Sequence, residues 1–278
     1  MPNPERADQR TARGVPSRGQ AVSRSTSILP TPVKVAGRCR RAGVRRTIPA
    51  LSELPPFVPF GAAHVGALAC VAIVAVLLVR IVRARRDFAA PVRWTLAAGI
   101  VGFLAFELGV AAREGWLSWR TVLPLELCDA ALVLAVFTLL RPRRAPAEVV
   151  YFWAGSGTLL AMLTPELPWG FPRWEFVVFF GLHGLVLVAA LVLVFGLGLQ
   201  PRPGAAWRML GVTAAWAAFV GFVNVVLGTN FMYLRHKPSV ATPLDWMGPW
   251  PIYIGVGGIV ALALFHVLAL PFRRDLYS

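Results

Sequence analysis

Charged residues are scarce in this sequence, and acidic residues are the scarcer kind. Charged side chains make up 15% of the 278 residues, with 13 acidic against 28 basic ones. A soluble domain is about a quarter charged. Hydrophobic residues reach 57%, and the mean hydropathy is +0.64. These values exclude an ordinary soluble domain and indicate an integral membrane protein.

The sequence also lacks the patterns that define several other classes. Its three cysteines have the spacing of neither a zinc site nor a disulfide framework. It shows no strand-like alternation of the kind found in membrane barrels. No secretory signal is present, because the first apolar run begins only near Phe57. We therefore expect neither a metal ion nor a cofactor.

Residues 1–56 are rich in Arg, Ser, Thr, Pro and Gly and have no apolar period. We interpret them as a disordered basic tail. Alternatively, the natural protein starts further in, near Val44, and much of this tail is not part of it. The charge could attract acidic lipid headgroups. The tail has no aromatic side chains on which bases could stack, so we expect no nucleic-acid partner.

Seven apolar runs follow, each close to the roughly 20 residues that a membrane-spanning helix needs. The expected spans are 60–80, 93–112, 122–140, 147–164, 174–198, 207–228 and 250–270. Helices satisfy their own backbone hydrogen bonds in lipid, so we expect an all-α polytopic bundle of about seven helices. This domain would occupy residues 57–272, and a short cytoplasmic tail would follow at 273–278.

Loop charge predicts the orientation of the bundle in a cell membrane. Loops after the first, third and fifth spans, with the C-terminal tail, hold twelve Arg or Lys, and the other loops hold five. Because cytoplasmic loops are enriched in basic residues, we expect the N-terminus outside and the C-terminus inside. The basic N-terminal tail argues for the opposite orientation. Six tryptophans flank the expected outer loops: Trp116, Trp119, Trp169, Trp174, Trp246 and Trp250.

We single out seven polar side chains inside the expected spans, where a charged group costs about 3 kcal/mol on insertion scales. A rise of about 1.5 Å per residue places all except one in the outer half of the membrane, roughly 6–14 Å deep. Either they line a pocket that opens to the outer leaflet, or they join helices through contacts worth about 0.6–2 kcal/mol each. The pocket candidates are His64, Glu107, Glu126, Asp129, His183 and Asn224, and the exception is His266.

Cys128 lies between two of these acids, Glu126 and Asp129. Negative charge does not activate a thiol, so a nucleophilic Cys128 would need a histidine partner. His183, at a similar expected depth, is the best candidate and His64 the second. The spacing alone favours a thiol that only packs between helices.

The loop between the last two spans is rich in aromatic residues and proline. It could cap the pocket through Asn230, Tyr233, Lys237, Asp245 and Trp250, or it could be an interfacial anchor.

Four spaced features carry a family resemblance over about residues 57–270. They are Phe60 with His64, Leu123-Pro124-x-x-x-Cys128-Asp129, His183, and Asn230-x-Met232-Tyr233-Leu234-x-x-Lys237-Pro238 followed by Gly248-Pro249-Trp250-Pro251. With these features the chain resembles the YwaF-like bacterial integral membrane family. One position departs from that family, which often has His where this chain has Glu126.

The YwaF-like family is similar to a eukaryotic membrane family that includes an ether-phospholipid acyltransferase with an intramembrane cysteine and histidine. More distant multispan hydrolases of fatty-acid esters use a threonine and a histidine. The resemblance implies that Cys128 carries an acyl group, that His183 acts as base, and that membrane lipids are the partners.

Two other functions remain open from the sequence. One is a non-catalytic membrane scaffold or assembly factor, and the other is a proton-coupled transporter, which would favour polar groups near the midplane. The oligomeric state is not readable from the sequence.

Overall fold

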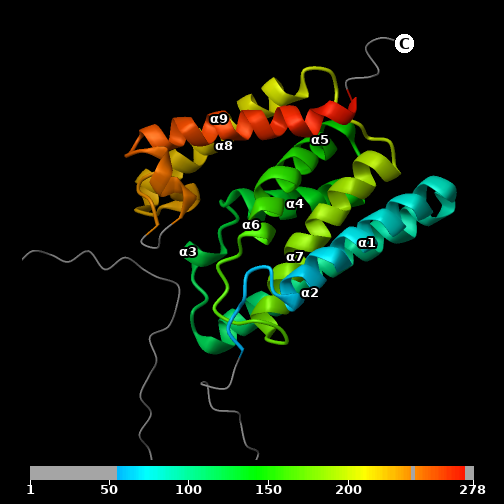
Figure 1. Cartoon of the computed structure of the whole chain (residues 1–278), viewed down its shortest axis with the longest axis horizontal. Coiled ribbons are helices and arrows are strands. Elements are labelled where there is room, and N and C mark those ends of the chain that lie inside the picture. The colour runs from blue at the N-terminus through cyan, green and yellow to red at the C-terminus, as the bar shows by residue number, and fades with distance from the viewer. Residues whose placement is uncertain (1–54, 239–241, 273–278) are drawn as a thin grey trace, which may run out of the picture. The chain divides into compact units, whose positions relative to one another are not determined.

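The computed structural model describes residues 55–238 and 242–272 (Figure 1). The chain divides into two units, 1–45 and 46–278, and every described residue belongs to the second. The expected disordered tail as far as residue 54 and the expected cytoplasmic tail at 273–278 lie outside the described residues. Pro55 is described, and its carbonyl accepts a hydrogen bond from the Gly170 N–H at 2.9 Å.

The all-α fold class is confirmed, since the described residues form helices and contain no strand. Five helical segments are long and apolar enough to cross a membrane, and the helix Leu127–Leu140 is a shorter apolar one. Together with the helical segment over residues 144–163, they make the expected seven. The helices are α1 (Ala62–Ala84), α2 (Ala89–Glu114), α4 (Leu127–Leu140), α5 (Arg144–Trp153), α6 (Leu159–Leu163), α7 (Trp174–Leu191), α8 (Ala205–Leu227) and α9 (Ile252–Ala269).

The helix α4 begins later than the sequence predicts. The expected span was 122–140, but α3 (Trp119–Val122) ends first, and residues 123–126 are not helical. Pro124 lies in this break, where its missing N–H and fixed φ disfavour continuation of a helix. Glu126 becomes the N-cap of α4, with φ −66° and ψ 150°. Its side chain therefore extends from the chain ahead of the helix rather than from a helical face.

Two helical segments widen into π-turns. Between α5 and α6, residues Ala154–Thr158 form η3, so α5, η3 and α6 make one span from residue 144 to 163. The C-terminal turn of α7 continues as η4 (Val192–Gly196). Single π-turns inside helices are rare and often occur at functional sites.

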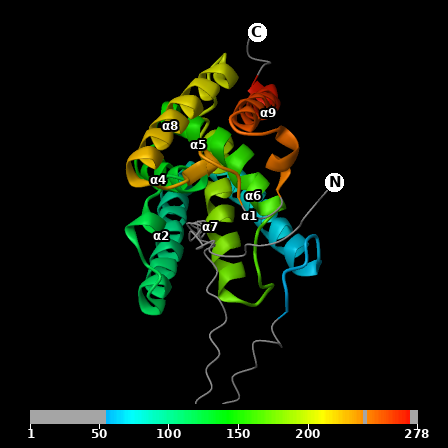
Figure 2. The same ribbon diagram turned by 90° about the vertical axis from the view of Figure 1, so that its left-hand side faces the viewer.

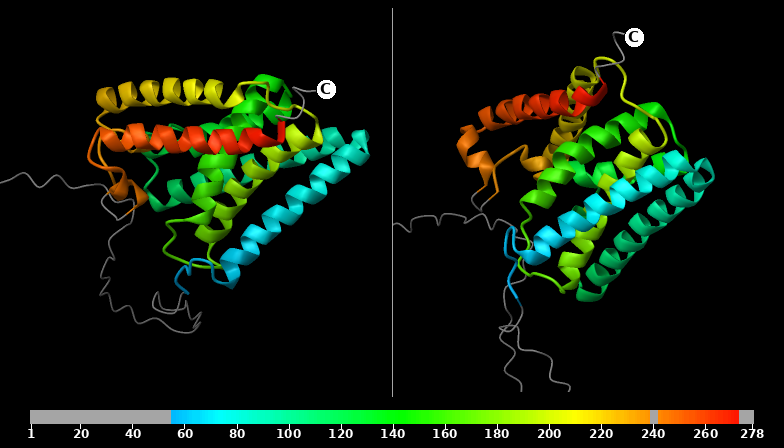
Figure 3. Two further views of the ribbon diagram at one scale, coloured as in Figure 1. Left: turned by 45° about the horizontal axis from the view of Figure 1, so that its top comes forward. Right: turned by 45° about the vertical axis from the view of Figure 1, so that its right-hand side comes forward.

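The helix α7 is the centre of the bundle. In the apolar stretch of α7 and η4, 61% of the residues are buried, against 11% in the corresponding stretches of α1, α8 and α9. It packs between α1 and α2, which hardly touch each other (Figure 2). The helices α8 and α9 form an antiparallel pair along α5 and η3 (Figure 3).

The two ends of the bundle differ in composition. At one end, which we call the arginine-rich end, guanidinium groups donate to backbone carbonyls at or just beyond helix C-termini. Arg86 bonds the Gly196 carbonyl at 2.9 Å, and Arg93 bonds the Leu139 carbonyl at 2.8 Å. The opposite end of the bundle, where α7 begins at Trp174, we call the tryptophan-rich end.

Candidate functional site

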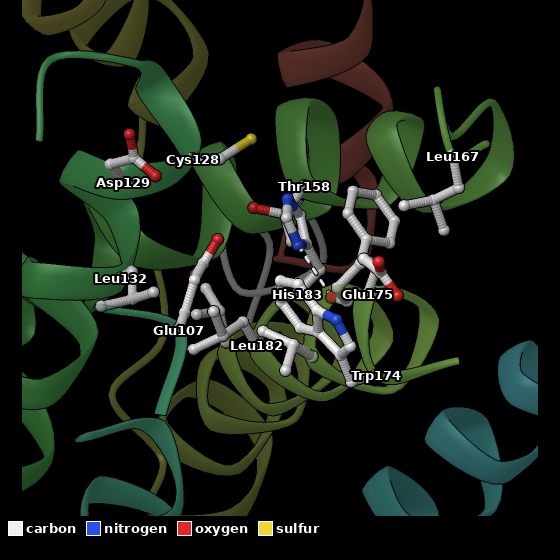
Figure 4. Close-up of a pocket in the computed structure, with 13 residues that line it drawn as sticks. Glu107, Cys128, Asp129, Leu132, Thr158, Leu167, Trp174, Glu175, Leu182 and His183 are labelled. Atoms are coloured by element: carbon white, nitrogen blue, oxygen red, sulfur yellow. Dashed lines mark hydrogen bonds between the residues drawn. The ribbon is translucent and has the colours of Figure 1, made fainter. Parts of the chain in front are cut away.

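One cavity of about 230 Å³ lies between α2, α4, η3 and α7. It holds four of the polar residues singled out from the sequence, contributed by three helices: Glu107, Cys128, Asp129 and His183 (Figure 4). The other lining residues are Leu132, Thr158, Leu167, Trp174, Glu175, Val178, Phe179, Leu182 and Val186. The lining residues of α7 recur every three or four positions, so they share one helical face. From Trp174 to Val186 this face is about 18 Å long, at a rise of 1.5 Å per residue.

Cys128 stands on the first turn of α4 because the helix begins just before it. Its thiol is free and partly buried. The Thr158 hydroxyl from η3 faces this thiol across the cavity. That hydroxyl makes no hydrogen bond of ordinary geometry with any described residue. The thiol and the hydroxyl are therefore both available to a third group.

The tautomer of His183 follows from its hydrogen bond. Its Nδ1 lies 2.9 Å from the Phe179 carbonyl oxygen, one turn earlier on α7. A carbonyl can only accept, so Nδ1 carries the proton and Nε2 keeps a free lone pair. The ring also stacks on the Phe179 ring, with 4.2 Å between centroids. A backbone carbonyl thus orients the imidazole.

Three carboxyl groups border the cavity in different ways. Glu175 is paired with Arg173, with an N–O distance of 2.6 Å. Asp129 lies at an exposed edge of α4, and the charges of Glu107 and Glu126 act on it. Within the described residues, neither Glu107 nor Asp129 makes an ion pair. No three His, Cys, Asp or Glu side chains in the described part of the chain are placed to hold a metal ion.

His64, although fully buried, is not part of this cavity. Its Nδ1 accepts the Phe60 N–H at 2.9 Å, so its Nε2–H donates to the Met162 carbonyl at 2.8 Å. Both ring nitrogens are occupied in joining the start of α1 to α6. His64 is therefore a clamp between two helices, and His183 is the histidine that faces Cys128.

Asn224 and Glu126 also lie outside the cavity lining, and both hold the loop after α8. Asn224 accepts the Phe231 N–H at 2.8 Å and donates to the Phe231 carbonyl at 2.9 Å. Both carboxylate oxygens of Glu126 receive the Met232 N–H, at 3.0 and 3.1 Å. Met232 has a left-handed φ of 57°, so these two side chains fix a turn that the backbone alone disfavours.

The expected cap residues mainly stabilise their own loop. The Asn230 amide bonds the His236 carbonyl at 2.8 Å, and the Trp250 indole donates to the Leu234 carbonyl at 3.0 Å. Lys237 lies 3.8 Å from Asp245. Burial, with the nearby carboxylates of Glu166 and Glu126, raises the pKa of the Tyr233 phenol. Glu126 therefore anchors the loop at the start of α4, beside the cavity.

The sequence analysis missed two buried polar residues. Glu148 is fully buried near the start of α5, where Arg208 and Arg202 hold it at 2.6 and 3.1 Å. A carboxylate inside the expected span 147–164 was a sufficient signal to find it. Thr158 carried no such signal, because a threonine in an apolar helix usually bonds its own backbone.

Fold and site together define a multi-pass helical membrane protein with a cysteine and a histidine in one intramembrane cavity. The chain belongs to the TMEM164 family, whose model matches residues 59–269. The "Uncharacterized protein" of Treponema pallidum (strain Nichols) is 30% identical over 232 residues, which cover 80% of this chain and 93% of that protein. The "MFS transporter L2" of Phoma sp. (strain ATCC 20986 / MF5453) is 27% identical over 203 residues, which cover 66% of this chain and 32% of that protein. No solved structure matches.

Proposed function

We propose that the protein transfers or hydrolyses the acyl esters of membrane lipids, with Cys128 as nucleophile and His183 as general base. The observation that carries the proposal is the His183 tautomer, which leaves Nε2 unprotonated in a cavity that also holds a thiol. A thiol beside a base held by a third group is the usual arrangement for covalent acyl transfer. We also propose that the chain is related to the YwaF-like bacterial proteins that its sequence resembles.

The reaction proceeds in two balanced steps. The sulfur of Cys128 attacks the ester carbonyl carbon while its proton passes to Nε2 of His183. The C–O bond breaks, and the leaving alcohol takes that proton, so the acyl group remains as a thioester on Cys128. A hydroxyl of a second lipid, or water, then attacks the thioester and gives its proton to His183, which returns it to the departing sulfur. Because the negative charges of Asp129 and Glu126 disfavour a free thiolate nearby, the proton leaves as the sulfur attacks.

The cavity suits the reacting part of a lipid better than a whole one. Its volume of about 230 Å³ is below the ~300–1,000 Å³ that a drug-sized ligand occupies. Leu132, Leu182 and Val186 make part of the wall apolar, and the carboxyl groups make another part polar. An ester group could lie between them while its acyl chain extends into the bilayer.

We further propose that the tryptophan-rich end faces the outside, as the loop charges favour. Trp174 and Glu175, on the first turn of α7, line the cavity at this end. Substrate would then reach Cys128 from the outer leaflet.

The test uses the full chain in lipid nanodiscs that contain a phosphatidylcholine with a terminal-alkyne acyl chain. Mass spectrometry should find the alkyne acyl group on Cys128, and neutral hydroxylamine should remove it. Cys128→Ala should abolish acyl transfer to an added lysophospholipid, whereas Cys70→Ala, on the exposed face of α1, should leave it unchanged. Full transfer by Cys128→Ala would overturn the proposal, and a natural chain without any transfer would favour a scaffold.

A further inference from the structure

Thr158 differs from the two other buried serine and threonine side chains in the helices of the described residues. Thr138 and Ser156 each donate to the carbonyl four residues earlier, at 2.6 Å in both cases. Thr158 is 1% exposed, lines the cavity, and has no hydrogen-bond partner within the described residues. A buried hydroxyl without a partner costs about 1–3 kcal/mol. That cost suggests a use that the resting structure does not display.

Thr158 is the last residue of the π-turn η3. The carbonyl of Ala154, four residues earlier, accepts the Leu159 N–H, so the turn is one residue wider than an α-helical turn. Neighbouring helices hold the turn from both sides. A Cβ on Gly155 would lie 2.9 Å from a Leu268 methyl of α9, and one on Gly157 would lie 3.3 Å from a Leu127 methyl of α4. The wide turn is thus packed in place and presents Thr158 to the cavity.

We propose that Thr158 relays the proton between Cys128 and His183. The relay is a step of the acyl-transfer reaction proposed above and rests on it. Figure 4 shows the Thr158 hydroxyl in the part of the cavity where the Cys128 side chain and the His183 ring end. No direct hydrogen bond joins the thiol to the imidazole in the described part of the chain, and the Thr158 hydroxyl lines the same cavity as both groups.

A hydroxyl suits this position because it donates and accepts at the same time. As the sulfur attacks, Oγ1 of Thr158 accepts the thiol proton and gives its own proton to Nε2 of His183. The net result is one proton moved from sulfur to nitrogen, and Thr158 is neutral before and after. The same path runs in reverse when the thioester is cleaved and the sulfur regains its proton.

The test measures thiol activation without any lipid substrate. The full chain in detergent is alkylated with iodoacetamide between pH 5.5 and 9, and mass spectrometry follows Cys128, with Cys70 as an internal reference. The charged groups that face the thiol are Glu107 from α2, Glu126 and Asp129 from the start of α4, and Glu175 and His183 from α7.

Thr158→Val keeps the shape of the side chain and removes the hydroxyl. We expect it to slow Cys128 alkylation at pH 7 about tenfold or more, because general-base assistance contributes about 10²–10⁴-fold. Thr158→Ser keeps the hydroxyl and should stay within about threefold of the natural chain. His183→Gln should lose as much as Thr158→Val, and the double variant should lose no more, because the two residues act as one path.

Three results would overturn the relay: an unchanged rate and pH profile in Thr158→Val, an equal loss in Thr158→Ser, or losses that multiply in the double variant. A gross folding defect in Thr158→Val would be recognised separately, because it would change the labelling of Cys70. The relay and the acyl-transfer proposal can fail separately. If Thr158→Val slows alkylation but the natural chain never gains an acyl group on Cys128, the relay stands and the acyl chemistry falls.

Discussion

The carboxylate of Glu148 is fully buried and paired with two arginines, so its loss should lower the stability of the bundle. Arg208 approaches one carboxylate oxygen through two guanidinium nitrogens at 2.6 and 2.8 Å. Arg202 approaches the other through its side chain at 3.1 Å and its backbone N–H at 3.2 Å. These bonds tie α5 to α8 and to the loop before it. The change Glu148→Gln keeps the volume but replaces a charged acceptor with an amide.

The magnitude follows from the exposure of the three side chains. Glu148 is fully buried, whereas the side chains of Arg202 and Arg208 are 44% and 33% exposed, so water can solvate the guanidinium groups again. Removing one partner of a fully buried ion pair costs about 3–5 kcal/mol. Because the two arginine side chains are partly exposed, we expect a cost below that range, about 2–3 kcal/mol, for Glu148→Gln. Arg208→Gln should cost more than Arg202→Gln because Arg208 makes the bidentate contact.

The assay is thermal unfolding in one detergent, followed by tryptophan fluorescence. At roughly 2–4 °C per kcal/mol for a domain of this size, Glu148→Gln should lower Tm by about 5–10 °C. Glu114→Gln serves as the matched control, since Glu114 is exposed and its side chain accepts a hydrogen bond from the Trp116 indole at 3.1 Å. If the two variants melt at the same temperature, or if Arg202→Gln is worse than Arg208→Gln, the reasoning from burial and geometry fails.

Two further predictions concern the loop and the central helix. Glu126→Ala should speed amide hydrogen exchange of residues 229–237 about tenfold or more, because a charge-assisted hydrogen bond is worth about 1.5–3 kcal/mol; unchanged protection would mean that the carboxylate does not hold the loop. Gly184→Ala should lower Tm, because its Cβ would lie 2.6 Å from a Val71 methyl and overpacking costs about 1–3 kcal/mol. Gly102→Ala, whose Cβ would meet nothing within 4 Å, should not lower Tm, and equal shifts in both variants would contradict the α1–α7 contact.

Hydropathy was sufficient to predict the helical class, because each span has to satisfy its own backbone in lipid. The start of α4 was not predictable in the same way. A proline that interrupts a helix and a proline in the first turn of a helix have the same sequence pattern. In the structure the helix starts after Pro124, and Glu126 accepts the Met232 N–H from a distant loop. Of the residues grouped by depth along the chain, Glu107, Asp129 and His183 line one cavity, and Glu126 and Asn224 do not. Depth could not separate His64 from the cavity residues, since residues at equal depth can face different sides of a bundle.

The position of His183 shows how packing sets the chemistry of the cavity. The two glycines that flank it on α7, Gly181 and Gly184, are the points of closest approach for Phe103 of α2 and Val71 of α1, at 2.7 and 2.6 Å from an added Cβ. The absence of side chains at these positions allows α1 and α2 to pack closely against α7 near His183. Because the ring is also held through the Phe179 carbonyl, its free nitrogen has little freedom to leave the cavity. Substitutions at these glycines should therefore disturb both the stability of the bundle and the reactivity of Cys128, although neither glycine touches the thiol.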